Sequence, residues 1–564
     1  MPAYDPNGAT VQNHKYIPYG TPDEDLKPNH YGSVYIPVDS WIYPEMTRLY
    51  SLGYVDTMFL SMRPWTRQSV LHMLAESADD IRNGSSDQAR DIYFAVMHEL
   101  NDDVTDGIQD RGLVYGVQSV YTRAMGITST PLRDSYHLGQ TIVNDYGRPY
   151  QGGFNNITGA SGLAEYGRFS LYVRGEYQHS PAATGYSQAL TSELSLIDEV
   201  PPTRFNLHQA TIPTGPIAAQ NPFRLIEANL SYHLLGNEIS LGKSDAWLGP
   251  AQGGALAWSN NAEDIYSFRI NRVEPLQIPL LSRLVGPMRY DFFYGSLKGH
   301  TFPNNPYTHS LMFSFRPTKN FEFAFQRTVI FGGAGHEPVT VHNFLRSFFS
   351  LSDTTENEKN SAADPGARYS DFSASYRLPY LRHYVTFYVD SIAHDDVTPI
   401  SAPRRAAYRT GLYVSQFPFA RKLDFRVEAV STDPGVTRSI NGSFNYYEII
   451  QRQGYTNKGF IMGDWIGREA KGGQAWVTYH LSGKEWVQLE YLNKKNAKDF
   501  AGGTTQNSFT ASVVKRFSHD NVELNAWFQY ERWKAPIYLA GPHSDTTTAV
   551  QLTFFPKLKS RASN

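Results

Sequence analysis

The stretch that decides the fold is VELNAWFQYER at residues 522–532, in which apolar and polar side chains alternate. Successive side chains of a β-strand point to opposite faces, so the stretch predicts a strand with one apolar and one polar face. The apolar face carries Val522, Leu524, Ala526, Phe528 and Tyr530, and the polar face carries Glu523, Asn525, Trp527, Gln529 and Glu531. A soluble strand usually has about 5–6 residues, whereas a tilted strand that crosses a bilayer needs about 9–11. The length therefore favours a membrane strand.

The same alternation recurs along the chain, at residues 168–178, 309–316, 321–327, 384–390, 423–429 and 474–481. The apolar residue is often Phe or Tyr, and membrane barrels place such rings at the two interfaces. An open sheet edge does not persist in lipid, so the repeated strands predict a closed wall. We expect Leu524 and Phe528 to face lipid, and Glu523, Gln529 and Glu531 to face a polar lumen.

The composition agrees with a barrel. The 564 residues contain no run of about 18 apolar residues, so a transmembrane helix is excluded. The mean hydropathy of −0.43 is typical of a soluble protein, but a barrel strand devotes only half of its residues to lipid. The chain has no cysteine, which fits an envelope protein without disulfides. A net charge of −3 provides no basic stripe, so we expect no nucleic-acid partner.

The first residues, Met1 to Asp5, lack the charged start and apolar core of a signal peptide. Export requires such a segment, so we expect that it has been removed and that the numbering begins near the mature end.

Three regions follow from the pattern. Residues 1–32 are rich in Pro, Asn, Asp and Gly and predict an extended arm. Residues 33–108 change to helical spacing and predict a small bundle or plug, with one helix ended by Gly53, a second capped by Thr66 and a third from about Asp87. Residues 109–564 predict the barrel.

The barrel region contains about 18 candidate strands, with 19 possible. The uncertain ones lie around residues 225–244 and 443–465. We expect short turns at 316–320, 378–380, 481–484 and 518–521, and long loops at 180–222, 330–368 and 532–546. A short helix is predicted at 341–351, either in the lumen or on the rim. The alternative, a propeller or a large sandwich, requires shorter strands, and a propeller also requires a repeat of about 40–50 residues, which is absent.

Residues 241–275 form the densest polar and aromatic segment, LGKSDAWLGPAQGGALAWSNNAEDIYSFRINRVEP. Aromatic faces stack on sugar rings, and carboxylates, amides and guanidinium groups hydrogen-bond to hydroxyls. The alternative is a lumen-filling loop whose charges pair with one another across the barrel. From this chemistry we predict polysaccharide contacts at Asp245, Trp247, Trp258, Asn260, Asn261, Arg269, Arg272, His336 and Glu337.

The last two of these residues lie in GGAGHEP at 332–338, which lacks the Lys-Ser/Thr of a phosphate-binding loop. The chain has no G-x-S-x-G and no H-E-x-x-H motif. We therefore predict no catalytic residue, no metal and no cofactor.

Several blocks resemble capsule assembly proteins of the Wzi family over residues 33 to about 555. They are YIPVDSW at 35–41, LSMRPWTR at 60–67, GKSDAWLGP at 242–250, SFRINR at 267–272, GAGHEP at 333–338 and FLRSFF at 344–349. The resemblance implies an 18-stranded outer-membrane barrel whose periplasmic end is closed by a helical bundle. It also implies a lectin-like role in holding capsular or other surface polysaccharide.

Three functions remain in view. The first is a non-enzymatic, monomeric surface lectin, in which many weak loop contacts hold a polymer through avidity. The second is a passive porin for small sugars or ions, with the charged lumen as its channel. The third, an outer-membrane enzyme, is disfavoured by the missing catalytic motifs.

Overall fold

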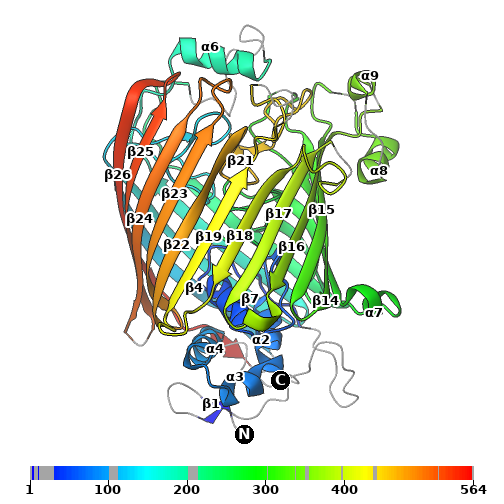
Figure 1. Ribbon diagram of the computed structural model, residues 1–564, viewed down its shortest axis with the longest axis vertical. Coiled ribbons are helices and arrows are strands. Elements are labelled where there is room, and N and C mark those ends of the chain that lie inside the picture. Colours follow the sequence, from blue (N-terminus) through cyan, green and yellow to red (C-terminus); the bar gives the residue numbers. More distant parts are fainter. Residues whose placement is uncertain are drawn as a thin grey trace.

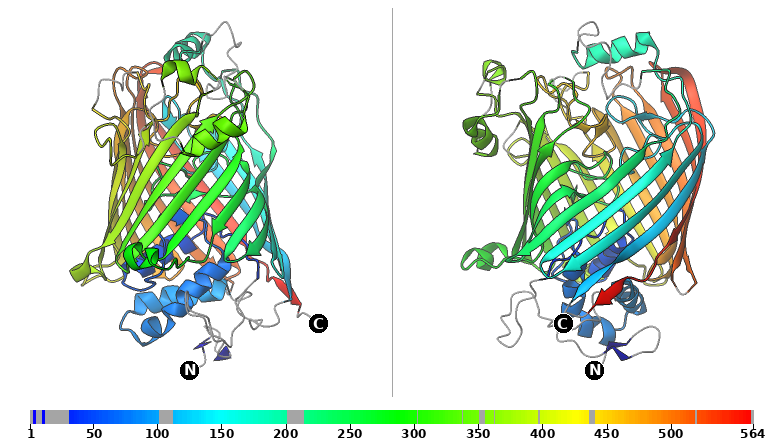
Figure 2. Two further views of the ribbon diagram at one scale, coloured as in Figure 1. Left: turned by 90° about the vertical axis from the view of Figure 1, so that its right-hand side faces the viewer. Right: turned by 180° about the vertical axis from the view of Figure 1, so that it is seen from behind.

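The computed structural model is shown in Figures 1 and 2. It describes residues 3–4, 10–11, 31–100, 112–200, 214–301, 303–336, 338–349, 355–361, 363–395, 398–435, 441–518 and 520–561. The predicted arm at 1–32 and the predicted boundary between 108 and 109 fall largely or wholly outside these residues. Within the arm, only Tyr31, Gly32 and a short antiparallel pair, β1 (Ala3–Tyr4) with β2 (Thr10–Val11), are described.

The wall is a closed barrel of 18 antiparallel strands within the described residues, which confirms the predicted fold class. Each strand pairs with its neighbours in the chain, and the last strand closes the ring by pairing with the first. Its short continuation, β27 (Lys559–Arg561), pairs with the start of the same first strand. The strands are β4 (Leu113–Ile127), β7 (Gly153–Tyr166), β8 (Phe169–His179), β9 (Phe223–Leu234), β10 (Asn237–Lys243), β12 (Tyr266–Arg272), β13 (Met288–Ser296), β14 (Tyr307–Thr318), β15 (Phe321–Phe331), β16 (Ala367–Arg377), β17 (Val385–His394), β18 (Ala407–Val414), β19 (Leu423–Ser431), β22 (Ala470–Ser482), β23 (Glu485–Asn496), β24 (Thr505–Phe517), β25 (Val522–Ala535) and β26 (Leu539–Phe554).

The alternation that predicted the wall is visible in β25. Phe528 and Tyr530 are each 47% exposed on the outside, whereas Gln529 is 8% and Glu531 only 1% exposed inside. Apolar side chains on the outer face and polar ones on the inner face are the pattern of a transmembrane barrel. Among the described residues, no helix is both long enough and apolar enough to cross a membrane.

Four helices form a bundle at one mouth of the barrel (Figure 1). They are α1 (Ile42–Ser51), α2 (Arg67–Glu76), α3 (Ala78–Asn83) and α4 (Asp87–Glu99). Thr66 caps α2 as predicted, because its side chain accepts a hydrogen bond from the backbone N–H of Ser69. The apolar stripes of these helices pack together in one core that includes Met46, Leu49 and Ile92.

The bundle is fastened to the wall by buried polar contacts. The Arg377 guanidinium lies 4.1 Å from the ring centre of Tyr50, and its Nη1 donates to the Tyr50 carbonyl oxygen at 2.9 Å. Glu322 on β15 accepts hydrogen bonds from the backbone N–H groups of Leu60 (2.7 Å) and Ser61 (3.0 Å). These contacts hold the bundle across the mouth of the barrel rather than beside it.

The connections agree with the predictions at most positions. The four predicted short turns all join adjacent strands, and the η1 turn (Pro379–Leu381) forms one of them. Residues 225–244 lie mostly in β9 and β10. The long loop predicted at 532–546 is wrong, because β25 and β26 continue as a hairpin and turn between Ala535 and Leu539. In this part of β25 the exposed residues are Arg532 and Lys534 and the buried ones are Trp533 and Ala535, so the apolar-out pattern that marks the other strands is absent.

Helices of the long loops lie at the ends of the wall (Figures 1 and 2). The helix predicted at 341–351 is α8 (Val341–Phe349), which lies on the outer rim, with α9 (Glu356–Lys359) nearby. α6 (Gln188–Ile197) covers the same end of the barrel. α7 (Leu281–Val285) projects outward at the end that holds the bundle.

The core of the barrel lies in its lumen, where three chain segments meet: 128–152, 244–265 and 432–469. They contain the short strands β5 (Arg133–Asp134), β6 (Gly139–Gln140), β11 (Trp247–Leu248), β20 (Thr456–Asn457) and β21 (Phe460–Ile461). β11 pairs with β3 (Met62–Arg63), which joins the lumen to the bundle. The segment at 443–465, an uncertain wall strand by sequence, is part of this core.

Candidate functional site

The lumen segments bind one another through backbone contacts. The Tyr146 N–H donates to the Asn260 carbonyl at 2.7 Å, and the Ser259 N–H donates to the Met462 carbonyl at 2.7 Å. The wall holds the 244–265 segment with carboxylates: Glu428 accepts from the Gln252 and Gly253 N–H groups at 2.8 and 3.0 Å. The polar inner face of the wall is therefore used to bind protein segments.

Glycine is required where this segment approaches the wall. A Cβ atom on Gly254 would lie 2.4 Å from Asp464 Oδ2. That carboxylate is already paired with Arg409, at 2.5 Å from Nε. A side chain at this position would displace a buried ion pair, which explains the glycines between the polar residues.

The predicted sugar-contacting residues of this segment are buried together in the lumen: Asp245 (1% exposed), Trp247 (5%), Trp258 (3%), Asn260 (4%) and Asn261 (0%). Asp245 accepts from the Val38 N–H at 2.7 Å and from the Tyr146 hydroxyl at 2.9 Å. The Trp258 ring packs edge-on against Phe293 at 4.8 Å. In this structure their partners are protein groups, as in the lumen-filling alternative; contact with a polysaccharide stays a prediction.

The remaining predicted residues are separated. Arg269, on β12, is buried and pairs with Asp291, with Nε 2.9 Å from Oδ1. Arg272 is the last residue of β12 and is half-buried. His336 lies in the β15–β16 loop, with Nε2 2.9 Å from Asp364 Oδ2, and Glu337 lies outside the described residues.

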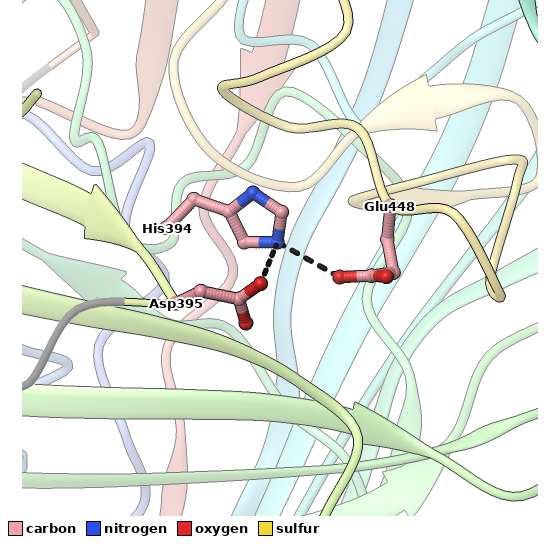
Figure 3. Close-up of side chains that lie close together, drawn as sticks. All are labelled: His394, Asp395 and Glu448. Carbon is pink, nitrogen blue, oxygen red and sulfur yellow. Dashed lines mark hydrogen bonds and ion pairs between the residues drawn. The ribbon is translucent and has the colours of Figure 1, made fainter. Parts of the chain in front are cut away.

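One cluster has the composition of a metal site: His394, Asp395 and Glu448 (Figure 3). His394 Nε2 lies 2.9 Å from Glu448 Oε2 and 3.8 Å from Asp395 Oδ2. The Lys359 ammonium contacts both carboxylates, at 2.7 Å from Asp395 and 3.1 Å from Glu448. Burial lowers the pKa of Lys359, but the two carboxylates raise it more. A divalent ion would have to displace this ammonium, so the cluster acts as an ion-pair network that ties the α9 loop to the lumen.

The end of the barrel opposite the bundle carries a partly open cavity of about 720 Å³. Its walls come from the β4–β7 loop, the β8–β9 loop and the β25–β26 turn. Arg133, Gln151, Tyr186 and Tyr538 are among the lining residues. The volume lies within the range of about 300–1,000 Å³ that is usual for small-molecule sites.

A row of aromatic rings supports this cavity. The ring centres of Tyr186 and Tyr538 are 4.9 Å apart, and Trp533 stacks on His543 at 4.6 Å and on Tyr538 at 6.1 Å. Sequence reasoning missed this site, because its residues come from three distant loops and none stands in a recognisable motif.

Comparison with known proteins identifies the family of this chain. Residues 122–548, more than half of the chain, match the family model described as capsule assembly protein Wzi. The chain belongs to the capsule assembly protein Wzi family. The family resemblance predicted from the sequence is therefore confirmed. No curated protein sequence matches the chain significantly.

The chain is also similar to solved structures. One is Wzi, described as an outer membrane protein involved in group 1 capsule assembly in Escherichia coli and as a carbohydrate-binding β-barrel. It is 15% identical, covers 93% of this chain and 99% of its own, and has a TM-score of 0.67. The outer membrane protein OprD from Pseudomonas aeruginosa is 7% identical over 80% of this chain and 96% of its own, with a TM-score of 0.40. Acinetobacter baumannii OccAB3 is 8% identical over 78% and 99%, with a TM-score of 0.41.

Proposed function

We propose that this chain is an outer-membrane protein that binds exported capsular or other surface polysaccharide and helps to hold it at the cell surface. Membership of the capsule assembly protein Wzi family supports this role. The carbohydrate binding described for the Escherichia coli protein gives the ligand class. In this proposal the chain acts as a monomer, surrounded by lipid and without catalysis.

The observation that carries the proposal is the occupied lumen. The bundle and three loops fill the interior and bind its carboxylates, as Glu428 does with Gln252 and Gly253. In a passive porin the charged groups of the inner wall would line a water-filled channel, whereas here they bind protein segments. The cavity with its aromatic residues lies at the end of the barrel opposite the bundle. A binding role with the bundle in the periplasm and the cavity outside fits this arrangement.

The test is polysaccharide retention on cells of the source strain that lack the gene. Complementation with the full chain should restore cell-attached polysaccharide, while the empty vector should leave it in the medium. A rim variant, Tyr186→Ser with Tyr538→Ser, should lower the attached fraction. Leu284→Ser should not, because this exposed residue belongs to α7, which lies at the bundle end of the barrel (Figure 1). Equal retention with and without the protein would overturn the proposal.

A further inference from the structure

The cavity at the rim is lined by a cation that has no counter-ion in contact. No hydrogen bond or ion pair joins the Arg133 guanidinium to any other described residue, and its Nη1 is buried without a partner. The neighbouring carboxylate of Asp134 is occupied by His137, whose Nδ1 lies 2.9 Å away. The Arg133 side chain is half-buried, and a buried guanidinium nitrogen without a partner is costly, so the site favours a negative group that is supplied from outside.

A second donor lines the same cavity. The Gln151 side chain is only 3% exposed, and its Nε2 has no hydrogen-bond partner among the described residues. Its backbone, in contrast, is fixed by Asn155, which accepts from the Gln151 N–H at 3.1 Å. Buried amides in folded proteins are normally hydrogen-bonded. An unpaired amide and an unpaired guanidinium nitrogen that line the same cavity indicate a missing acceptor.

The rest of the lining sets the class of ligand. Among the described lining residues there is no Asp and no Glu, so the cavity has no internal anion to compete with a bound one. Tyr186 and Tyr538 also line this cavity, and aromatic rings pack against the apolar face of a sugar ring. A planar guanidinium binds a carboxylate through two parallel hydrogen bonds.

We propose that the rim cavity is a subsite for a carboxylate-bearing sugar, in which Arg133 and Gln151 bind the carboxylate and Tyr186 and Tyr538 pack on the ring. The inference rests on the proposed polysaccharide-binding function and adds the chemical class of the sugar recognised. Carboxylate binding and ring packing are assigned to different residues, so each can be tested with its own variant.

The experiment is calorimetric titration of the full chain in detergent with trigalacturonate and with its fully methyl-esterified form, which is neutral. Wild type should bind the acid at least tenfold more tightly than the ester. Arg133→Gln should weaken binding of the acid about tenfold and leave the ester unchanged, since one charge-assisted pair is lost. Tyr538→Ala should weaken both forms alike. Arg532→Gln, an exposed arginine on the outside of β25, is the matched control.

If Arg133→Gln does not fold, Gln151→Leu serves as the second variant and should also reduce the preference for the acid. Equal binding of acid and ester by wild type, binding of neither, or an unchanged preference in both variants would overturn the inference. Any of these results combined with normal retention of the strain's own polysaccharide would leave the proposed function standing. Failure of that retention would overturn the function itself.

Discussion

His137 lies between two carboxylates, with Nδ1 2.9 Å from Asp134 Oδ2 and Nε2 3.0 Å from Asp198 Oδ2. Asp198 also accepts from Arg468 Nη1 at 2.7 Å. The four side chains come from the β4–β7, β8–β9 and β19–β22 connections, so one buried charged cluster joins the three. Burial by itself lowers the pKa of His137, but the two carboxylates raise it to about 9. The protonated imidazole therefore links the β4–β7 loop to the β8–β9 loop through ion pairs with Asp134 and Asp198.

We expect this cluster to make stability depend on pH. The pKa of His137 rises from about 6.5 in the unfolded chain to about 9 in the folded one. Its contribution is fully present below about pH 6.5 and is lost as the pH rises through about 9, an effect on the order of 3 kcal/mol. The melting temperature of wild type should therefore fall between pH 6 and pH 9.5 by more than that of His137→Gln. His342→Gln, an exposed histidine on α8, should behave as wild type; identical profiles for wild type and His137→Gln would contradict the assignment.

We expect residues 244–265 to block ion conduction through the barrel and to be held there by carboxylates of the wall. Glu428 holds two of its N–H groups, and Asp390 accepts from the Leu256 N–H at 2.8 Å. Removing a buried charged partner costs about 3–5 kcal/mol, because the groups left behind stay unpaired. Wild type should show no large stable conductance in a planar bilayer, whereas Glu428→Ala with Asp390→Ala should open one.

The control for this measurement is Glu485→Ala, since Glu485 pairs with Lys515 at 2.9 Å and contacts no lumen segment in the described residues. A large open conductance in wild type would show that the lumen segments do not block the barrel, and would favour the porin.

Trp258→Ala tests whether this aromatic residue supports the core or contacts the ligand. The ring is 3% exposed and packs against Phe293 and Tyr455. Truncation should cost about 3–5 kcal/mol of unfolding free energy, measured by denaturant titration. Polysaccharide bound per folded molecule should stay unchanged. A tenfold loss of binding at unchanged stability would instead support the predicted sugar contact of Trp258.

The wall could be predicted from the sequence because its signal is local. Each strand shows its two faces within a few residues, as Phe528 and Glu531 do, and the hairpin turns follow directly. The bundle was equally accessible, since caps such as Thr66 and apolar stripes repeat at helical spacing. A barrel strand pairs with its neighbours in the chain, so it can be predicted without knowing any long-range contact.

The lumen and the rim could not be predicted in the same way. Sugar sites and buried polar loops use the same residue types, so the sequence left both interpretations of residues 244–265 open, and only the long-range partners of Asp245 show how the segment packs in the lumen. Tyr446 lies in the 443–465 region, an uncertain wall strand by sequence, yet its hydroxyl donates to the Leu256 carbonyl at 2.7 Å inside the barrel. Arg133 belongs to no recognisable sequence motif. Only the three-dimensional structure shows that its guanidinium has no paired anion among the described residues.

The stack of Phe348 on His309 should be one of the main ring contacts that hold the rim helix α8 to the outside of the wall, beside those of Phe344 with Tyr294 and Phe331. The Phe348 ring lies parallel to the His309 imidazole of β14 at 3.9 Å, and His309 Nε2 lies 2.8 Å from the Ser347 hydroxyl. Phe348→Ala removes about 2 kcal/mol of packing. Amides of residues 341–349 should then exchange hydrogen roughly 30-fold faster in detergent micelles, because the helix detaches more often. Phe349→Ala is the matched control, as that side chain is 76% exposed and should leave the exchange rate unchanged. Equal acceleration in the two variants would mean that the helix is not held by the histidine stack.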